Sequence, residues 1–216
     1  MTHNTYSWRA TRLLAALGVA ALSACSLLKP STVEPPAFYA LEAAPASALP
    51  RASDGTMRKL PTLIITPTRA AAGFDHQRII YVRNDHQLEY FARSEWVDTP
   101  ARMLGPLLAT AMQNTGVFGA VVVMPAGATG DVRLETEIVQ LQHNFQTSPS
   151  KVQFTLRAFL LDNQTRRVLA WREFRGEAAS ATDTPQSGVA AANKAVQTVL
   201  AELAQFVAEQ PRTTPS

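Results

Sequence analysis

The chain has 216 residues, a formal net charge of +3 and one cysteine, Cys25. The 20 Lys and Arg residues nearly balance the 17 Asp and Glu residues and form no basic block, so nucleic acid is not an expected partner. One cysteine also excludes an internal disulfide framework and a multi-thiolate metal site, so a hydrophobic core must hold the fold.

The N-terminal segment predicts a signal peptide that ends before Cys25. Arg9 and Arg12 precede the apolar run LLAALGVAAL, and no acidic residue occurs before Cys25. Ten residues suit the apolar core of a signal peptide, whereas a membrane-spanning helix needs about 20. Ser23 and Ala24 are small, as a signal peptidase requires before its cut. An ordinary cleavage site and a buried core cysteine are the alternatives.

The tetrapeptide Leu-Ser-Ala-Cys resembles a bacterial lipobox. That resemblance implies that residues 1–24 are a lipoprotein signal peptide, that Cys25 receives a diacylglyceryl thioether, and that the new N-terminus is acylated. Two or more acyl chains hold a protein firmly on a membrane. Ser26 follows in place of Asp, which in Gram-negative lipoproteins implies sorting to the periplasmic face of the outer membrane.

The mature chain of 192 residues is long enough for one domain with a real core. Without Arg9 and Arg12, 18 basic residues face 17 acidic ones, a formal charge of +1. Residues 25–37 are predicted to be an acylated tether, because Pro30, Pro35 and Pro36 oppose regular structure. Its reach is about 40 Å when fully extended. One domain is expected over 38–209, followed by a disordered tail over 210–216.

The first half of the domain predicts short strands followed by a helix. Strands are expected over 38–43, 63–66, 78–82 and 87–92, with a turn at Asn84 and Asp85 between the last two. The helix follows Asp98 or Thr99 as its cap, with Pro100 in its first turn, and ends at Gly116. Gly105 and Pro106 lie inside this pattern, so a kink or a later start is an alternative.

The second half predicts long strands and a long helix. Strands are expected over 120–124, 131–145, 151–161 and 166–178, with a β-bulge near Ile138 where the apolar alternation changes phase. The final helix carries one apolar stripe, made of Val189, Ala192, Val196, Val199, Leu200, Leu203 and Val207. Tight turns make the strand pairs antiparallel. The predicted fold is therefore α+β, a two-layer sandwich of a mainly antiparallel sheet with two helices on one face.

No pattern in the mature chain predicts catalysis, a metal or a cofactor. Neither a Gly-x-Ser-x-Gly elbow nor an HExxH motif occurs. Glu135 and Glu137 share a strand face beside Arg133 and are interpreted as a solvated face, and Ser180 and Asp183 as loop and capping residues. Three histidines lack a partner at metal-binding spacing and are interpreted as satisfied or solvated: His76, His86 and His143.

Several segments resemble one protein family. They are Phe38-Tyr39 with Leu41 just after the tether, Tyr90 followed by Trp96 and Pro100, and the late segment LLDNQTRRVLAWREF. In this order behind a lipobox they resemble the ABC-type transport auxiliary lipoproteins, the PqiC-like partners of MCE-domain lipid transport systems. The residues Val97-Asp98-Thr99 depart slightly from the small and acidic pair that commonly precedes the proline in that family.

The resemblance implies a non-catalytic periplasmic lipoprotein that docks in an ABC/MCE-type intermembrane lipid transport system. Its implied partners are the membrane, an MCE-domain protein, ABC transporter components and a possible second copy. It supplies no catalytic residues, and Trp96 is interpreted as core packing. The alternative function is a lipoprotein that carries a lipid in its own cavity, which a lined cavity would favour and a packed core would not. An envelope hydrolase is disfavoured by the missing motifs.

One apolar cluster is predicted on the outer face of the late hairpin. A turn at 163–165 would place Phe159 opposite Leu169 and Arg157 opposite Trp171, with Leu161 on the same side. Leu156, Leu160 and Val168 would then face the helix-covered core. The predicted partner-binding residues are Phe159, Leu161, Leu169 and Trp171. The alternative is that another segment, such as the loop over 50–59, covers them.

Overall fold

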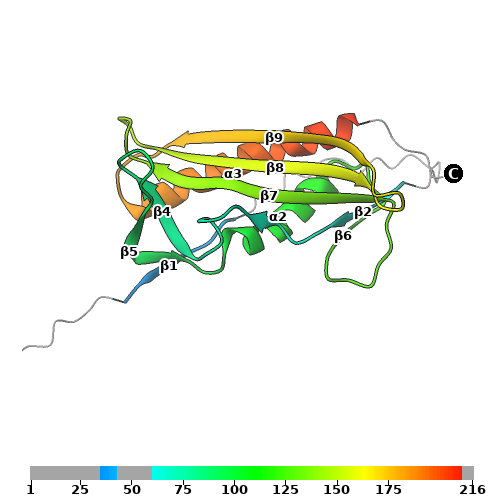
Figure 1. Ribbon diagram of the computed structural model, residues 1–216, viewed down its shortest axis with the longest axis horizontal. Coiled ribbons are helices and arrows are strands. Elements are labelled where there is room, and N and C mark those ends of the chain that lie inside the picture. Colours follow the sequence, from blue (N-terminus) through cyan, green and yellow to red (C-terminus); the bar gives the residue numbers. More distant parts are fainter. Residues whose placement is uncertain (1–34, 43–59, 211–216) are drawn as a thin grey trace, which may run out of the picture. The chain divides into compact units, whose positions relative to one another are not determined.

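The computed structural model describes residues 35–42 and 60–210 (Figure 1). The signal peptide, Cys25, Ser26, nearly all of the tether, the loop over 50–59 and the tail from 211 lie outside the described residues. The predictions that concern those segments therefore stay predictions.

The described residues form nine strands and two helices, which confirms the α+β fold class. The elements of the first half are β1 (Ala37–Tyr39), β2 (Thr62–Ile65), β3 (Arg69–Ala70), β4 (Arg78–Val82), β5 (Glu89–Trp96) and α2 (Pro100–Asn114). Those of the second half are β6 (Ala120–Val123), β7 (Val132–Asn144), β8 (Lys151–Asp162), β9 (Val168–Ala179) and α3 (Pro185–Glu209). β1 is shorter than predicted, β5 is longer, and the two-residue β3 was not predicted.

Strand β7 is the central strand of a mixed sheet and pairs with four other strands. On one side it pairs antiparallel with β8 along its whole length, and β8 pairs antiparallel with β9. On its other side β2, β3 and β4 lie one after another and pair parallel with it. The short strands β6, β5 and β1 extend the sheet from β2, β4 and β5. The predicted β-bulge is confirmed by a register shift between Ile138 and Gln140.

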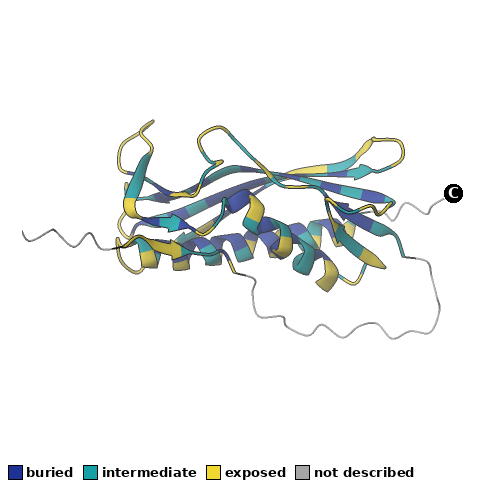
Figure 2. Cartoon of the chain, turned by 90° about the horizontal axis from the view of Figure 1, so that it is seen from below, coloured by how far each residue is buried: buried dark blue, intermediate teal, exposed yellow. Residues whose placement is uncertain are grey.

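Both helices cover the same face of the sheet, seen below it in Figure 2. α2 begins at Pro100 behind Thr99, as predicted, and continues through Pro106, so the alternative of a later start is wrong. α3 begins behind Thr184, whose side chain accepts a hydrogen bond from the Ser187 N–H. The whole predicted stripe of α3 is buried, from Val189 to Val207. The indole of Trp96, 2% exposed, also belongs to this core, as predicted.

A glycine lets α3 lie close to strand β9. A Cβ atom at Gly176 would stand 2.6 Å from the Ala195 carbonyl oxygen and 2.9 Å from Val199 Cγ2. Both residues belong to the middle of α3 and are fully buried. Gly176 therefore sets how near the helix approaches the edge of the sheet.

The register of the late hairpin differs from the predicted one by two residues. Phe159 pairs with Trp171, and Arg157 pairs with Glu173. The difference arises because the connection extends to Arg167, whose carbonyl accepts from the Asp162 N–H, and because the ladder shifts between Leu160 and Leu161. Val168 consequently pairs with Leu161 and is 48% exposed, so its predicted place in the core is wrong.

Candidate functional site

The uncovered face of the sheet carries an apolar cluster at the β8–β9 end, which we call the hairpin cluster: Phe159, Leu161, Val168 and Trp171. The rings of Phe159 and Trp171 stack with centroids 6.1 Å apart and an interplanar angle of 23°. Trp171 is 61% exposed, although burial of an indole normally contributes substantially to the stability of a fold or an interface. Such exposure of a large aromatic side chain is typical of an interaction surface.

Three of the four predicted partner-binding residues belong to this cluster, and the fourth is displaced from it. Leu169 lies at the register shift, between the Leu160–Ala170 pair and the Leu161–Val168 pair, and is partly buried. Val168, which pairs with Leu161, is the fourth member of the cluster instead of Leu169. Residue alternation alone cannot find this exchange, because it depends on one extra residue in the strand.

A network of ion pairs borders the hairpin cluster. Arg157, two residues before Phe159, contacts Glu137 at 3.1 Å and Glu173 at 3.0 Å. Arg175 adds a 2.7 Å contact to Glu173. Hydrogen bonds from Arg157 and then Arg175 hold the pKa of Glu173 below its usual value. Glu137 is thus a paired surface carboxylate, and the arrangement resembles the polar rim beside the apolar centre of a protein interface.

The opposite end of the sheet holds a hydrogen-bonded polar group that the sequence did not predict: the buried His143 and Ser150 and the exposed Asp183. His143, 2% exposed, has Nε2 3.0 Å from the Ser150 hydroxyl, which donates to the Asp183 carboxylate at 2.6 Å. Because the serine proton points to Asp183, His143 does not act as a base toward Ser150, and the group lacks the order of a nucleophilic triad. Its members come from β7, the β7–β8 connection and the loop before α3, so no local motif could reveal it.

The second nitrogen of His143 has no partner. Nδ1 is buried, and a Cβ atom at Gly188 would lie 2.5 Å from it. Burial lowers the pKa of His143, although the charge of Asp183 opposes that shift. The imidazole is therefore held neutral against the first turn of α3.

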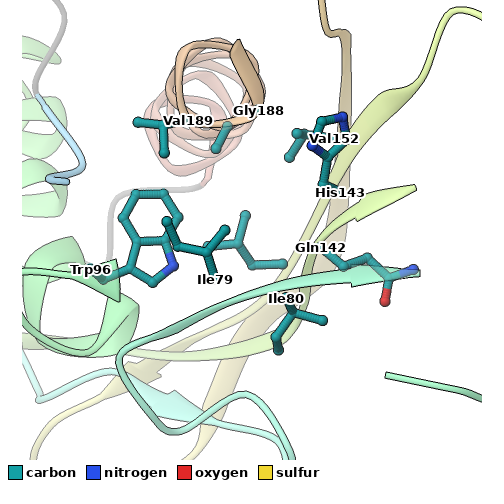
Figure 3. Close-up of a pocket in the computed structure, with 10 residues that line it drawn as sticks. Ile79, Ile80, Trp96, Gln142, His143, Val152, Gly188 and Val189 are labelled. Atoms are coloured by element: carbon teal, nitrogen blue, oxygen red, sulfur yellow. The ribbon is translucent and has the colours of Figure 1, made fainter. Parts of the chain in front are cut away.

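His143 lines a cavity between the sheet and α3 (Figure 3). The cavity measures about 10 Å³ and is walled by Ile79, Trp96 and Val189, among others. That volume is about the minimum that holds one water molecule and is far too small for an acyl chain. A neighbouring groove of about 440 Å³ is lined mainly by polar residues from 145–150 and 180–183, together with Phe145, Pro149 and Ala181. Its hydroxyl and carboxylate walls do not suit an acyl chain either.

Metal-binding groups and membrane-spanning helices are both absent from the described residues. No group of three His, Cys, Asp or Glu side chains in 35–42 and 60–210 could hold a metal ion. Neither of the two helices described there is long and apolar enough to cross a membrane.

In the described residues the fold is an α+β sandwich, with both helices on one face of the sheet and neither on the other. The sequence model of the ABC-type transport auxiliary lipoprotein component family matches residues 39–204, and the chain belongs to that family. No curated protein matches it.

Two solved structures have the same fold. Protein XCC0632 from Xanthomonas campestris is 22% identical, with a TM-score of 0.67 over 79% of this chain and 93% of that one. A structure of an uncharacterized protein is 14% identical, with a TM-score of 0.62 over 81% of this chain and 99% of that one. At these identities the similarity establishes the fold alone. The family predicted from the sequence is thus confirmed by the family match.

Proposed function

We propose that this protein is a membrane-anchored periplasmic docking subunit of an ABC/MCE-type intermembrane lipid transport system. The observation that carries the proposal is the exposed hairpin cluster on the open sheet face of a member of the transport auxiliary family. The occupant is an apolar surface of the MCE-domain protein. The stacked pair of Phe159 and Trp171 supplies rigid aromatic anchors, and the Arg157 network supplies the polar rim.

The proposed anchor is the acylated Cys25, and the proposed site is the periplasmic face of the outer membrane, with Ser26 as the sorting residue. The lipobox-like sequence and the membership of a lipoprotein family support this placement. A tether as short as 25–37 keeps the domain near the bilayer, where a docking subunit must meet the transport machine.

Packing favours docking over carriage of a lipid inside the domain. The α3 stripe is closely packed, with Ala195, Val196, Val199 and Leu203 fully buried. The cavity beside His143 has room for about one water molecule, and the groove next to it is polar. Neither space resembles the apolar pocket that a carried acyl chain needs.

The docking test is Trp171→Glu, with Val123→Glu as the control. Val123 is also exposed and belongs to β6, outside the hairpin cluster. We expect Trp171→Glu to abolish co-purification with the MCE-domain protein of the same organism in mild detergent, because a buried unpaired carboxylate opposes the contact. The melting temperature should stay unchanged, and the control should bind normally.

Three outcomes would contradict the docking proposal. A collapsed melting curve for Trp171→Glu would place the indole in a core. Unchanged binding would exclude the cluster as the contact. Lost self-association with MCE binding retained, measured by mass photometry, would assign the surface to a second copy.

The anchoring test is Cys25→Ser in the full-length chain. We expect the variant to leave the membrane fraction in a flotation gradient and to keep its melting temperature, because Cys25 precedes the predicted tether and the folded domain in the sequence. A variant that still floats would refute the lipobox interpretation.

A further inference from the structure

The large apolar side chains that are exposed on the described residues lie at the two ends of the sheet. Three belong to β1 and the β4–β5 region: Phe38, Leu88 and Val97. Three belong to β6 and the β8–β9 hairpin: Val123, Val168 and Trp171. Phe38 pairs with Glu95, which pairs with Arg78, three residues before the contact of β4 with His143 of β7. Phe159 and Trp171 pair opposite Glu135, eight residues before His143 along β7.

Phe38 and Val97 form one small apolar surface, which we call the foot. Phe38 pairs with Glu95, and the Val97 N–H donates to the Tyr39 carbonyl at 2.8 Å, so Val97 directly continues this ladder. Because side chains alternate along a strand, Phe38 and Val97 lie on one side, while Trp96 points into the core. Phe38 is 59% exposed and Val97 51%.

The foot lies where the chain enters the domain. β1 begins at Ala37, at the end of the sheet opposite the β8–β9 turn (Figure 1). Phe38 follows Cys25 by 13 residues, which limits their separation to about 45 Å and gives a flexible-chain average of roughly 20 Å. An acyl anchor at Cys25 therefore holds the foot at a high effective concentration beside the bilayer.

We propose that Phe38 and Val97 insert into the headgroup–acyl boundary of the membrane and hold the β1 end of the domain at the bilayer. This inference rests on the acylation of Cys25 in the proposed function. A lipid surface fits the foot better than a protein does, because two side chains are far smaller than the ~800 Å² per partner of a stable protein interface. Shallow insertion of a few apolar side chains beside a lipid anchor adds a second membrane signal.

The orientation has a direct consequence for docking. With the foot at the bilayer, the hairpin cluster lies toward the other end of the sheet, where a partner from the opposite membrane can reach it (Figure 1). Phe159 and Trp171 pair opposite Glu135, eight residues of β7 from His143, which is about 26 Å at ~3.3 Å per strand residue.

The test places one fluorescent probe at each end. The mature chain contains only the buried Trp96 and the exposed Trp171, because Trp8 lies in the signal peptide. Phe38→Trp in a Trp171→Phe background puts the probe in the foot, the wild-type protein keeps it in the hairpin cluster, and Trp171→Phe alone reports the Trp96 background. Each acylated protein is reconstituted in phosphatidylethanolamine–phosphatidylglycerol vesicles with and without brominated acyl chains.

We expect brominated lipid to quench the residue-38 probe by roughly half, since inserted side chains lie about 5–10 Å deep, and to leave the wild-type Trp171 signal unchanged. Adding Val97→Asp should abolish the quenching without altering the melting temperature. An unquenched residue-38 probe on protein that floats with the vesicles would overturn the foot, as would equal quenching of both probes. Protein that does not float at all would instead overturn the anchor, and the foot with it.

Discussion

Substitution of Gly176 by alanine tests how closely α3 lies on the sheet. The new Cβ would stand 2.6 Å from the Ala195 carbonyl oxygen and 2.9 Å from Val199 Cγ2. Both contacts are several tenths of an ångström too short, and the oxygen belongs to helix backbone that cannot rotate away. The helix must therefore move, and overpacking of this kind costs about 1–3 kcal/mol.

The net effect is smaller than the packing cost, because alanine also restricts the unfolded chain. Lower conformational entropy of the unfolded chain stabilises the folded state by about 0.4–1 kcal/mol where the backbone accepts alanine. We expect a net loss of about 1–2 kcal/mol in the free energy of unfolding, which lowers the melting temperature by about 2–8 °C for a domain of this size.

The assay is urea and thermal unfolding of Gly176→Ala beside Gly127→Ala. A Cβ at Gly127 meets nothing within 4 Å, so this control should change stability by less than about 0.5 kcal/mol. Equal stability of the two variants would refute the close approach of α3 to β9.

Three further predictions concern the core, the buried histidine and sorting. Leu200→Ala should lower the free energy of unfolding by about 2–5 kcal/mol, because Leu200 is 7% exposed in the α3 stripe, and a loss under 1 kcal/mol in denaturant melts would show that α3 packs loosely. The pKa of His143 is lower in the folded than in the unfolded chain, so only the unfolded chain takes up this proton as the pH falls through about 6.5. Stability should therefore fall below that pH, His143→Gln should flatten this part of the profile, and parallel profiles for the two proteins would contradict the assignment. Ser26→Asp should shift the protein toward the inner membrane in a density gradient, and an unchanged position would refute the role of Ser26 in sorting.

The long elements could be predicted because each repeats one pattern many times. The alternation from Val132 onward specifies β7, and the change of phase near Ile138 specifies its bulge. The α3 stripe repeats over seven positions, all of which are buried. Strand β3 has two residues and depends on pairing with β7, so it has no pattern of its own.

The candidate sites were harder to predict because they depend on pairing between segments. Because of a single register shift, Val168 belongs to the hairpin cluster and the predicted Leu169 does not. The His143 group requires that β7, the β7–β8 connection and the loop before α3 meet at one end of the sheet. The exposure of Phe38 follows from the parallel pairing of β1 with β5, which residue spacing cannot reveal.

A row of ion pairs crosses the sheet face between the two surfaces for which we propose binding. Arg157 links Glu137 on β7 to Glu173 on β9 across three strands. These charges make the middle of the face unfavourable for another sheet to stack on, since contact would strip water from the ion pairs. Strands β4, β7 and β8 lie between the foot and the hairpin cluster. A partner seated on Trp171 and a membrane beneath Phe38 can then be held apart by one rigid sheet, which is the geometry that a docking subunit between a bilayer and a transport machine requires.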